Sequence, residues 1–196
     1  MTGVSQAVLS DLPFAPLLWD VIRKPFDIER LTRSLTTCIA FHMSPRPQLR
    51  QEVCEWLEQR STPTAAKSGV VAAAGGGKTL DLRAAFGYRP RLAEAYFPLP
   101  VSGPFPICSA VRNAHAVWVA SVITDSSDYP LLAPVWKANR SLAIAAVPII
   151  EGGRAVGAVA WSFKEPQRFD ERQRDFFLRL ARECLPLVER RNARAS

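Results

Sequence analysis

Two apolar runs joined by a glycine-containing segment constrain the fold of this chain more than any other feature. Leu142–Ile150 and Ala155–Phe163 each have the length and composition of a strand. Between them, Glu151-Gly152-Gly153-Arg154 has the composition of a tight turn. The three segments predict a β-hairpin, and a hairpin of this kind indicates an antiparallel sheet.

Further strands are predicted upstream of this hairpin. Gly69–Ala74 is an apolar run, and Gly75-Gly76-Gly77 after it supplies residues that tolerate a positive φ in a turn. A half-buried strand is predicted next, because apolar residues alternate with other residues at Leu80, Leu82, Ala84 and Phe86. Ala116–Ser121 predicts one more strand. We interpret residues 87–115 and 124–141 as two irregular inserts between strands.

Helices are predicted at both ends of the chain and within the inserts. The clearest is the final helix, which Asp170 and Gln173 open with the spacing of a capping box. Pro186 should kink or weaken its last turn, and its apolar stripe consists of Phe177, Leu180, Ala181, Cys184 and Val188. Helical spacing also predicts helices over residues 27–43 and about 48–60, and shorter ones near 107–113 and 131–139.

The predicted fold class is therefore α/β (α+β): a central antiparallel sheet of five to six strands, flanked by helices, with an N-terminal helical extension. We divide the chain into an N-terminal arm and helix (1–47), a main domain (48–192) and a short tail (193–196). The 196 residues are 48% hydrophobic, which is enough apolar material for a core.

Charge and cysteine usage narrow the possible partners and surroundings. The net charge is +7, and we attribute most of the excess to arginines spread along the chain. The four cysteines, Cys38, Cys54, Cys108 and Cys184, form no CxxC pair, so we expect no structural zinc site. The longest apolar run is too short to span a membrane, and no signal peptide opens the chain. We therefore expect a cytoplasmic location without a membrane partner.

Residues Ala72–Thr79 come within one residue of a Walker A phosphate loop, because Ala72 stands where the first glycine would be. A phosphate loop must open a helix, whose N-terminus holds the phosphates. The following residues alternate with the period of a strand instead. We therefore predict that this segment is a hairpin turn.

Several short sequence segments from about residue 48 onward resemble those of the GAF family in their order and spacing. They include Ser68-Gly69-Val70-Val71, the Gly87-Tyr88 step, Tyr129-Pro130-Leu131, Ala145-Ala146-Val147-Pro148-Ile149 and Phe169-Asp170. The resemblance implies a GAF/PAS-like sheet and a regulatory role, with a small molecule bound between the inserts and one sheet face. It identifies neither the ligand nor a cofactor, and the signature of cyclic-nucleotide-binding members is absent.

We therefore expect a non-catalytic sensory or regulatory protein that binds an unidentified small molecule and acts through a signalling-protein partner. A small-molecule site needs apolar walls and a few directed polar groups. The inserts supply such candidates for ligand binding: Cys108, Arg112, Asp125, Asp128, Tyr129, Trp136 and Asn139. We assign no catalytic residue and no metal ligand.

Two alternatives stay open. Cys108 begins a predicted helix, where a thiol pKa can be lowered, so a thiol-based reductase of the free methionine-R-sulfoxide reductase type is possible. Such an enzyme also uses a resolving cysteine in the second insert, where this chain has none. A nucleic-acid-binding adaptor is the other alternative. It would need Arg172, Arg179, Arg182 and Arg190 on one exposed face of the final helix.

The ends of the chain predict a homodimer. Phe176, Leu185 and Leu187 lie off the centre line of the final apolar stripe and widen its face. The predicted N-terminal helices also carry more apolar surface than a small sheet can cover. Pairing of the N-terminal and final helices across a two-fold axis would bury both sets and leave the pocket face free.

Overall fold

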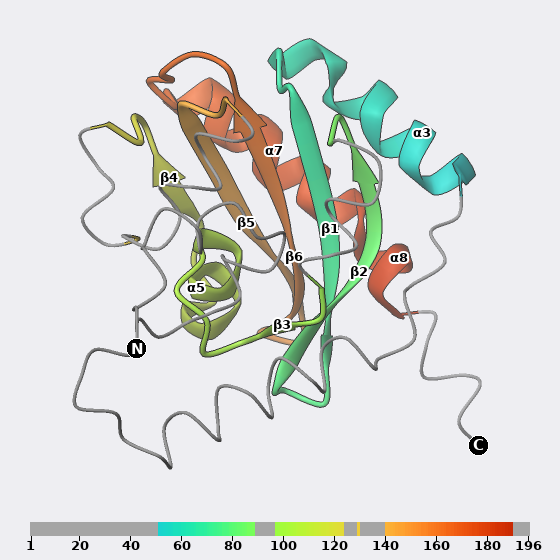
Figure 1. The fold of residues 1–196 in the computed structure, drawn as a ribbon. Helices are drawn as coiled ribbons and strands as arrows, with labels where there is room; N and C mark the ends of the chain where they lie inside the picture. The colour runs from blue at the N-terminus through green and yellow to red at the C-terminus, as the bar shows by residue number, and fades with distance from the viewer. Residues whose placement is uncertain (1–50, 89–96, 124–128, 130–139, 190–196) are drawn as a thin grey trace, which may run out of the picture. The chain divides into compact units, whose positions relative to one another are not determined.

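Six strands form one curled antiparallel sheet in the structure, a computed structural model that describes residues 51–88, 97–123, 129 and 140–189 (Figure 1). All of these residues lie within Pro47–Ser196, the second of the two units into which the chain divides. The elements are α3 (Gln51–Ser61), the 3-10 turn η2 (Thr62–Thr64), β1 (Ser68–Gly75), β2 (Thr79–Phe86), β3 (Leu99–Pro100), α5 (Pro106–Asn113), β4 (Val117–Val119), β5 (Ala143–Glu151), β6 (Arg154–Phe163), α7 (Glu171–Glu183) and α8 (Leu185–Glu189). The predicted antiparallel sheet of five to six strands flanked by helices is confirmed, and the predicted N-terminal extension (1–47) lies outside the described residues.

Two hairpins meet in the middle of the sheet, whose strand order is β3-β2-β1-β6-β5-β4. β1 pairs antiparallel with β2 on one side and with β6 on the other. β5 and β6 form the hairpin predicted from the two apolar runs. Its turn contains Gly152 and Gly153, with φ values of 54° and 78°, which glycine adopts without the steric cost of a Cβ atom.

The Walker-like segment is the turn of the β1–β2 hairpin, as predicted. β1 continues to Gly75, and Gly76 and Gly77 have positive φ values. The backbone N–H of Lys78 donates to the Gly75 carbonyl at 3.2 Å, and the next residue begins β2. The segment therefore leads into an antiparallel strand and not into a helix.

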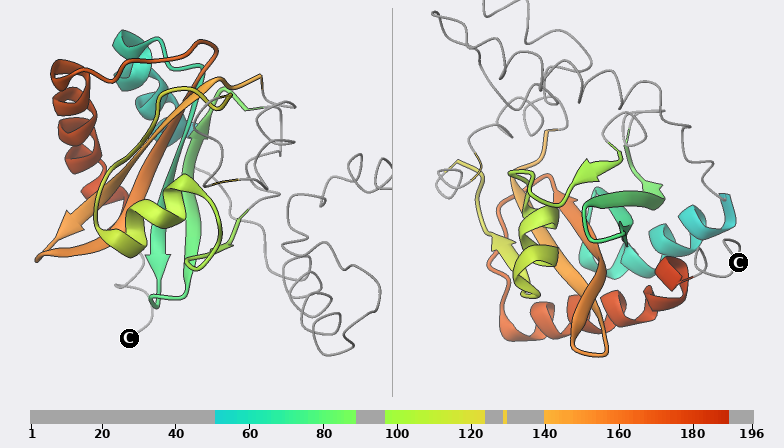
Figure 2. Two further views of the ribbon diagram at one scale, coloured as in Figure 1. Left: turned by 90° about the vertical axis from the view of Figure 1, so that its left-hand side faces the viewer. Right: turned by 90° about the horizontal axis from the view of Figure 1, so that it is seen from below.

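α3, α7 and α8 pack on one face of the sheet, and Figure 2 shows α3 and α7 together on that side. The indole Nε1 of Trp161 donates to Ser61 Oγ at 2.9 Å, which ties the end of α3 to β6. Arg60 of α3 pairs with Glu183 of α7 at 2.8 Å. The core of this layer contains Leu57, Val71, Ala84, Phe86, Val147, Val159, Trp161, Phe163, Phe169, Phe177, Leu180 and Cys184.

Aromatic rings fill the centre of this layer around Phe177. The rings of Trp161, Phe163, Trp118 and Phe169 have centroids between 4.8 and 6.3 Å from that of Phe177. Tilted and edge-on arrangements dominate, as expected for rings with negative faces and positive edges. This cluster fixes α7 against β4 and β6.

α7 begins as predicted. The Asp170 side chain accepts from the Gln173 backbone N–H at 2.8 Å, and the Gln173 side chain accepts from the Asp170 backbone N–H at 3.2 Å. The helix ends at Glu183, and Pro186 lies within the separate short helix α8. All five residues of the predicted apolar stripe are buried.

One inference about this helix is wrong. Phe176, Leu185 and Leu187 do not widen an exposed face, because they are partly buried and pack against the domain's own core. The chain turns between α7 and α8, so residues that diverge on a continuous helix return to the same core. The exposed large apolar residue of α7 is Leu178, at 37%.

β2 differs from the single half-buried strand that its alternation predicts. Val71 of β1 pairs with Ala84, but its neighbour Ala72 pairs with Leu82, so Arg83 is an extra residue in a β-bulge. A shift of one residue moves a side chain to the other face. Ala84 and Phe86 therefore join the core under the helices, whereas Leu80 and Leu82 are buried outside that core.

The edge strand β3 was not predicted. It has two residues, Leu99 and Pro100, which pair with Leu80 and Thr79. Proline lacks the N–H donor of a strand interior, so it is acceptable at a sheet edge, and the surrounding prolines hid the strand in the sequence. The predicted helices at 27–43 and 131–139 lie outside the described residues. No helix in the described part of the chain is long and apolar enough to cross a membrane.

Candidate functional site

The sheet face opposite α3 and α7 has a floor of small side chains. Ala72 of β1 lies opposite Ala158 of β6, and both are fully buried outside the helix-covered core. Ala146 of β5 is also fully buried and belongs to the same set. α5 packs against β5 and β6, and Figure 2 shows it on the side away from α7. Alanines let the helix approach the sheet closely.

α5 is a short helix with clear boundaries. It follows Phe105, which is extended, and Pro106 occupies the first turn, where its fixed φ suits a helix start. It ends at Asn113, and the next residue, Ala114, has a left-handed φ of 50°. The buried side of α5 carries Ile107, Cys108 and Ala110. This side positions the sequence-predicted Cys108 against the interior.

Cys108 is fully buried, and its thiol donates to the Pro100 carbonyl at 3.3 Å. Burial raises the pKa of the thiol to about 12, although the Arg112 charge and a hydrogen bond with the Phe105 backbone act in the opposite direction. The thiolate is the nucleophilic form of cysteine. At neutral pH, Cys108 is therefore held as the unreactive thiol.

We expect the described cysteines to differ strongly in alkylation by iodoacetamide. Near pH 8, a pKa of about 12 instead of the ordinary 9.0 lowers the thiolate fraction of Cys108 roughly a thousandfold. Cys54 is half-buried and should react first, whereas Cys108 and the buried Cys184 should react only in denaturant. Mass spectrometry of peptides after timed labelling measures this order. Rapid native labelling of Cys108 would contradict the buried thiol.

The same raised pKa predicts a loss of stability at high pH. The unfolded chain releases the Cys108 proton near the ordinary pKa of 9.0, and the folded chain does so only near 12. The contribution of this thiol to the free energy of unfolding is therefore complete below about pH 9 and falls as the pH rises toward 12. A Cys108→Ser variant should lose this part of the alkaline dependence.

Arg112, another predicted site residue, holds the loop that precedes α5. Its Nη1 donates to the carbonyls of Val101 and Gly103 at 2.7 and 2.8 Å. Its Nη2 donates to Ser109 Oγ at 2.9 Å. These bonds tie the loop after β3 to α5, so the guanidinium positions the local backbone in this structure.

The other predicted site residues belong to the second insert. Tyr129 is buried, at 9% exposed. Asp125, Asp128, Trp136 and Asn139 lie outside the described residues. The structure therefore brings Cys108 and Arg112 together on α5 and leaves the remaining predicted set untested.

A cluster of three hydroxyl groups on the same sheet face was not predicted from the sequence. Ser68 opens β1 and lies opposite Ser162 of β6, on the alternation that carries Ala72 and Ala158. The Tyr88 hydroxyl lies against both serine hydroxyls. Burial raises the pKa of Tyr88, and the neighbouring serine hydroxyls offset part of that effect. Ser68 Oγ is fully buried. In the described part of the chain, no donor or acceptor lies at the distance and angle of a well-formed hydrogen bond to it.

Gly87 places Tyr88 in this cluster. Its φ of 71° lies in the left-handed region, and a Cβ atom there would collide with the Lys67 carbonyl oxygen and with Ser68 Cα. Glycine alone lets the chain pass so close to the start of β1. The sequence signals near the cluster were the Gly87-Tyr88 step and the Ser68-Gly69-Val70-Val71 segment, and neither showed that the three hydroxyls meet.

A second surface lies on the outer side of α7, where Arg172, Arg179 and Arg182 line one hollow of about 520 Å³. The nucleic-acid alternative requires these three arginines on one exposed face, together with Arg190, which lies outside the described residues. Glu171 and Asp175 line the same hollow, so its charge is mixed.

The fold and the two sheet faces define an α/β domain with helices from the start and end of the domain on one face and a short helix over the other. A family model described as "GAF domain" matches residues 45–186. The chain belongs to the GAF domain family. No curated protein sequence matches it significantly.

Solved structures share this fold at low sequence identity. The GAF domain of an Acinetobacter phosphoenolpyruvate-protein phosphotransferase is 14% identical, with a TM-score of 0.59 over 85% of this chain and 94% of that one. A domain assigned to a two-component sensor histidine kinase protein of Sinorhizobium meliloti 1021 is 16% identical, with a TM-score of 0.56 over 76% and 98%. A type II free methionine-R-sulfoxide reductase of Thermoplasma acidophilum is 15% identical, with a TM-score of 0.52 over 70% and 87%. The fold therefore occurs in a domain of a phosphotransferase, in a domain of a sensor histidine kinase protein and in a free methionine-R-sulfoxide reductase.

Proposed function

We propose that this GAF domain is a non-catalytic sensory or regulatory module that binds a small molecule against the sheet face carrying Tyr88, Ser68 and Ser162. The observation that supports it best is the buried Ser68 hydroxyl without a partner of ordinary geometry among the described residues. An unpaired buried hydroxyl costs about 1–3 kcal/mol. A ligand group that bonds with Ser68 Oγ would remove this cost, which favours binding at this position.

The chemistry of the described groups limits the ligand class. Hydroxyl groups both donate and accept hydrogen bonds, and the three in this cluster are neutral at physiological pH. The neighbouring floor is alanine. We infer a small neutral ligand with an apolar body and a hydroxyl, carbonyl or amide group. Asp125, Asp128, Tyr129, Trp136 and Asn139 stay predicted contacts from the second insert.

The regulatory step follows from the two-sided sheet. Ligand capture on one face would favour one arrangement of the inserts and strands, and α3 and α7 pack on the other face of the same strands. A signalling-protein partner would read the resulting shift in the helices. We propose that the module acts as a homodimer through helices on the face opposite the ligand.

The test is whether a small molecule remains bound through Ser68. Native mass spectrometry of the chain purified from its host should detect a co-purified small molecule, and the Ser68→Ala and Tyr88→Phe variants should lose it. Loss of one hydrogen bond of about 1–1.5 kcal/mol corresponds to roughly tenfold weaker binding. Because Ser68 Oγ lacks a well-formed hydrogen bond among the described residues, Ser68→Ala should leave the free energy of unfolding unchanged or raise it.

Ser61→Ala is the matched control on the opposite face. It removes a buried hydroxyl that accepts from Trp161 Nε1, so it should lower the free energy of unfolding by about 1–3 kcal/mol. It should nevertheless retain the bound molecule. Retention of the molecule in both Ser68→Ala and Tyr88→Phe would show that the cluster is not the site.

A further inference from the structure

α5 has few of the features that stabilise a short helix on its own. It has eight residues, and helices of this length are marginal without tertiary contacts. Phe105, which precedes it, provides no side-chain hydrogen bond to its first turn. Ala114, which follows it, has a left-handed φ of 50°, a conformation that disfavours a residue with a Cβ atom. Contacts with the rest of the domain must therefore hold this helix in place.

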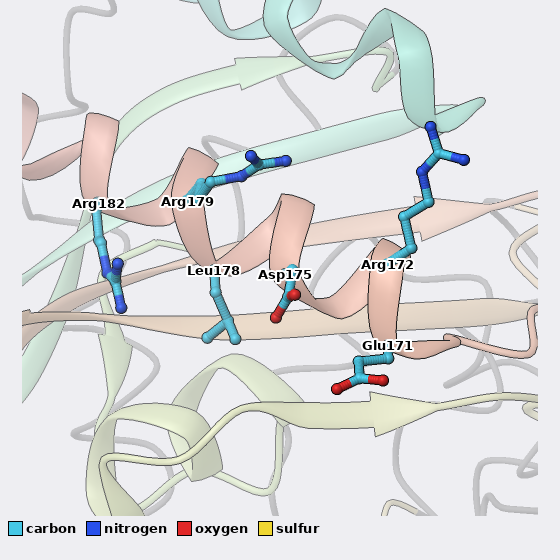
Figure 3. A pocket seen from close by; sticks show the side chains of 6 residues that line it. All are labelled: Glu171, Arg172, Asp175, Leu178, Arg179 and Arg182. Atoms are coloured by element: carbon cyan, nitrogen blue, oxygen red, sulfur yellow. The ribbon is translucent and has the colours of Figure 1, made fainter.

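Apolar packing holds α5 less firmly than it holds α7. The floor beneath α5 is made of alanines, and the helix itself buries Ile107, Cys108 and Ala110. The outer side of α7 carries the charged residues shown in Figure 3, but Phe177 on its inner side lies among four other aromatic rings. Aromatic side chains bury much more apolar surface than alanine does. Polar contacts therefore have a larger share in holding α5 than in holding α7.

One arginine fastens α5 to the loop that precedes it. Nη1 of Arg112, in the last turn of the helix, donates to the carbonyls of Val101 and Gly103 at 2.7 and 2.8 Å. The loop is anchored to the β1–β2 turn in its turn, because the Val101 backbone N–H donates to the Lys78 carbonyl at 2.9 Å. Hydrogen bonds from a charged donor are stronger than neutral ones. Arg112 is exposed, so water can replace these bonds when they break.

We propose that α5 opens and closes over the alanine floor as a local unit, and that Arg112 is the latch that holds it closed. A segment with little apolar packing opens at a lower free-energy cost than the whole domain unfolds. Opening would uncover Ala72, Ala146 and Ala158, the apolar part of the candidate site. The role of this opening rests on the proposed function, because it would admit a small molecule to that floor. The opening itself can be measured without any ligand.

Two cysteines report separately on local opening and on global unfolding. Cys108 is fully buried on the inner side of α5, and its thiol donates to the Pro100 carbonyl at 3.3 Å. It becomes accessible to alkylation when α5 leaves the sheet. Cys184 is fully buried in the core on the opposite face, so it reacts only when that core unfolds. The ratio of the two alkylation rates in the native protein therefore measures the opening of α5.

Two substitutions at the latch test the proposal on the full chain. R112Q removes both the charge and the paired bonds, whereas R112K keeps the charge but cannot reproduce the planar fork of guanidinium donors. We expect iodoacetamide to label Cys108 at least about tenfold faster in both variants than in the wild type, with the labelling of Cys184 unchanged. A tenfold increase in the open form corresponds to about 1.4 kcal/mol. Mass spectrometry of peptides over long native incubations measures both rates.

The direction of the change separates a latch from a purely electrostatic role. The positive charge of Arg112 lowers the pKa of Cys108, so removing the charge without any opening would raise that pKa and slow the labelling in R112Q. Charge alone would also leave R112K like the wild type. Faster labelling in both variants is therefore expected only of a latch.

R154Q is the matched control, because it removes one positive charge from an exposed arginine at the β5–β6 turn, outside the latch. Both cysteines should be labelled in it at wild-type rates. Labelling of Cys108 that is unchanged or slower in either R112Q or R112K would overturn the latch. An equal acceleration of Cys184 would show global unfolding and overturn the opening of α5 as a local unit. No ligand takes part in these rates, so native mass spectrometry tests the proposed function independently of them.

Discussion

Gly87→Ala is expected to lower the free energy of unfolding by about 2–5 kcal/mol. The left-handed φ of 71° alone costs an L-residue about 1–2 kcal/mol. The new Cβ would also collide with the Lys67 carbonyl oxygen and Ser68 Cα, which are backbone atoms and cannot rotate away. Overpacking of this kind adds about 1–3 kcal/mol. Urea denaturation followed by circular dichroism measures the loss.

Gly152→Ala separates the two causes. Gly152 also has a left-handed φ, of 54°, but a Cβ atom added there would meet no other atom within 4 Å. This variant should lose only the conformational cost, about 1–2 kcal/mol. Equal losses in the two variants would show that the chain does not pass as closely over Ser68 as described. Gly87→Ala should also displace Tyr88 and weaken ligand binding, whereas Gly152→Ala should not.

Phe177→Ala is the second change with a large expected effect, a loss of about 3–5 kcal/mol. Phe177 is 1% exposed and lies among four other aromatic rings between α7 and the sheet. Its removal would leave a cavity that rigid neighbouring rings cannot fill. Thermal and urea denaturation should both report the loss.

Phe176→Ala is the control for this position, because it removes the same side chain from the adjacent residue. Phe176 is only partly buried at the margin of the core. Its loss should cost less than half as much, since water can occupy part of the vacated space. A similar cost for the two variants would contradict the central position of Phe177.

The sequence predicted most of the fold because its strongest signals are local. The turn at Gly152 and Gly153 and the capping box at Asp170 each depend on residues within a few positions of one another. The hairpins and the final helix follow from such signals. The bulge at Arg83 could not be found in this way, because only pairing with β1 shows that Leu82 and Ala84 belong to different faces.

The candidate site was harder to predict because its residues are distant in the sequence. Ser68, Tyr88 and Ser162 come together only when β1 pairs with β6 in the observed register and Gly87 turns the chain back. The residues that flank each of these three in the sequence give no indication that their side chains meet. By contrast, Cys108 attracted attention through its position at a helix start, and burial makes it less reactive than that position suggests.

The bulge in β2 determines which changes in the length of this strand the sheet can accommodate. With Arg83 present, Leu80 and Leu82 fill one layer while Ala84 and Phe86 fill the other. A homologue that lacks the residue at position 83 would keep both layers in a regular strand, because Leu82 and Ala84 already lie on opposite faces. A homologue that keeps the bulge and loses a different residue between the turn and Gly87 would move the side chains on one side of the deletion to the opposite face. A single-residue deletion in β2 should therefore be tolerated at the bulge and nowhere else in the strand, and single-residue insertions should be confined to the loops.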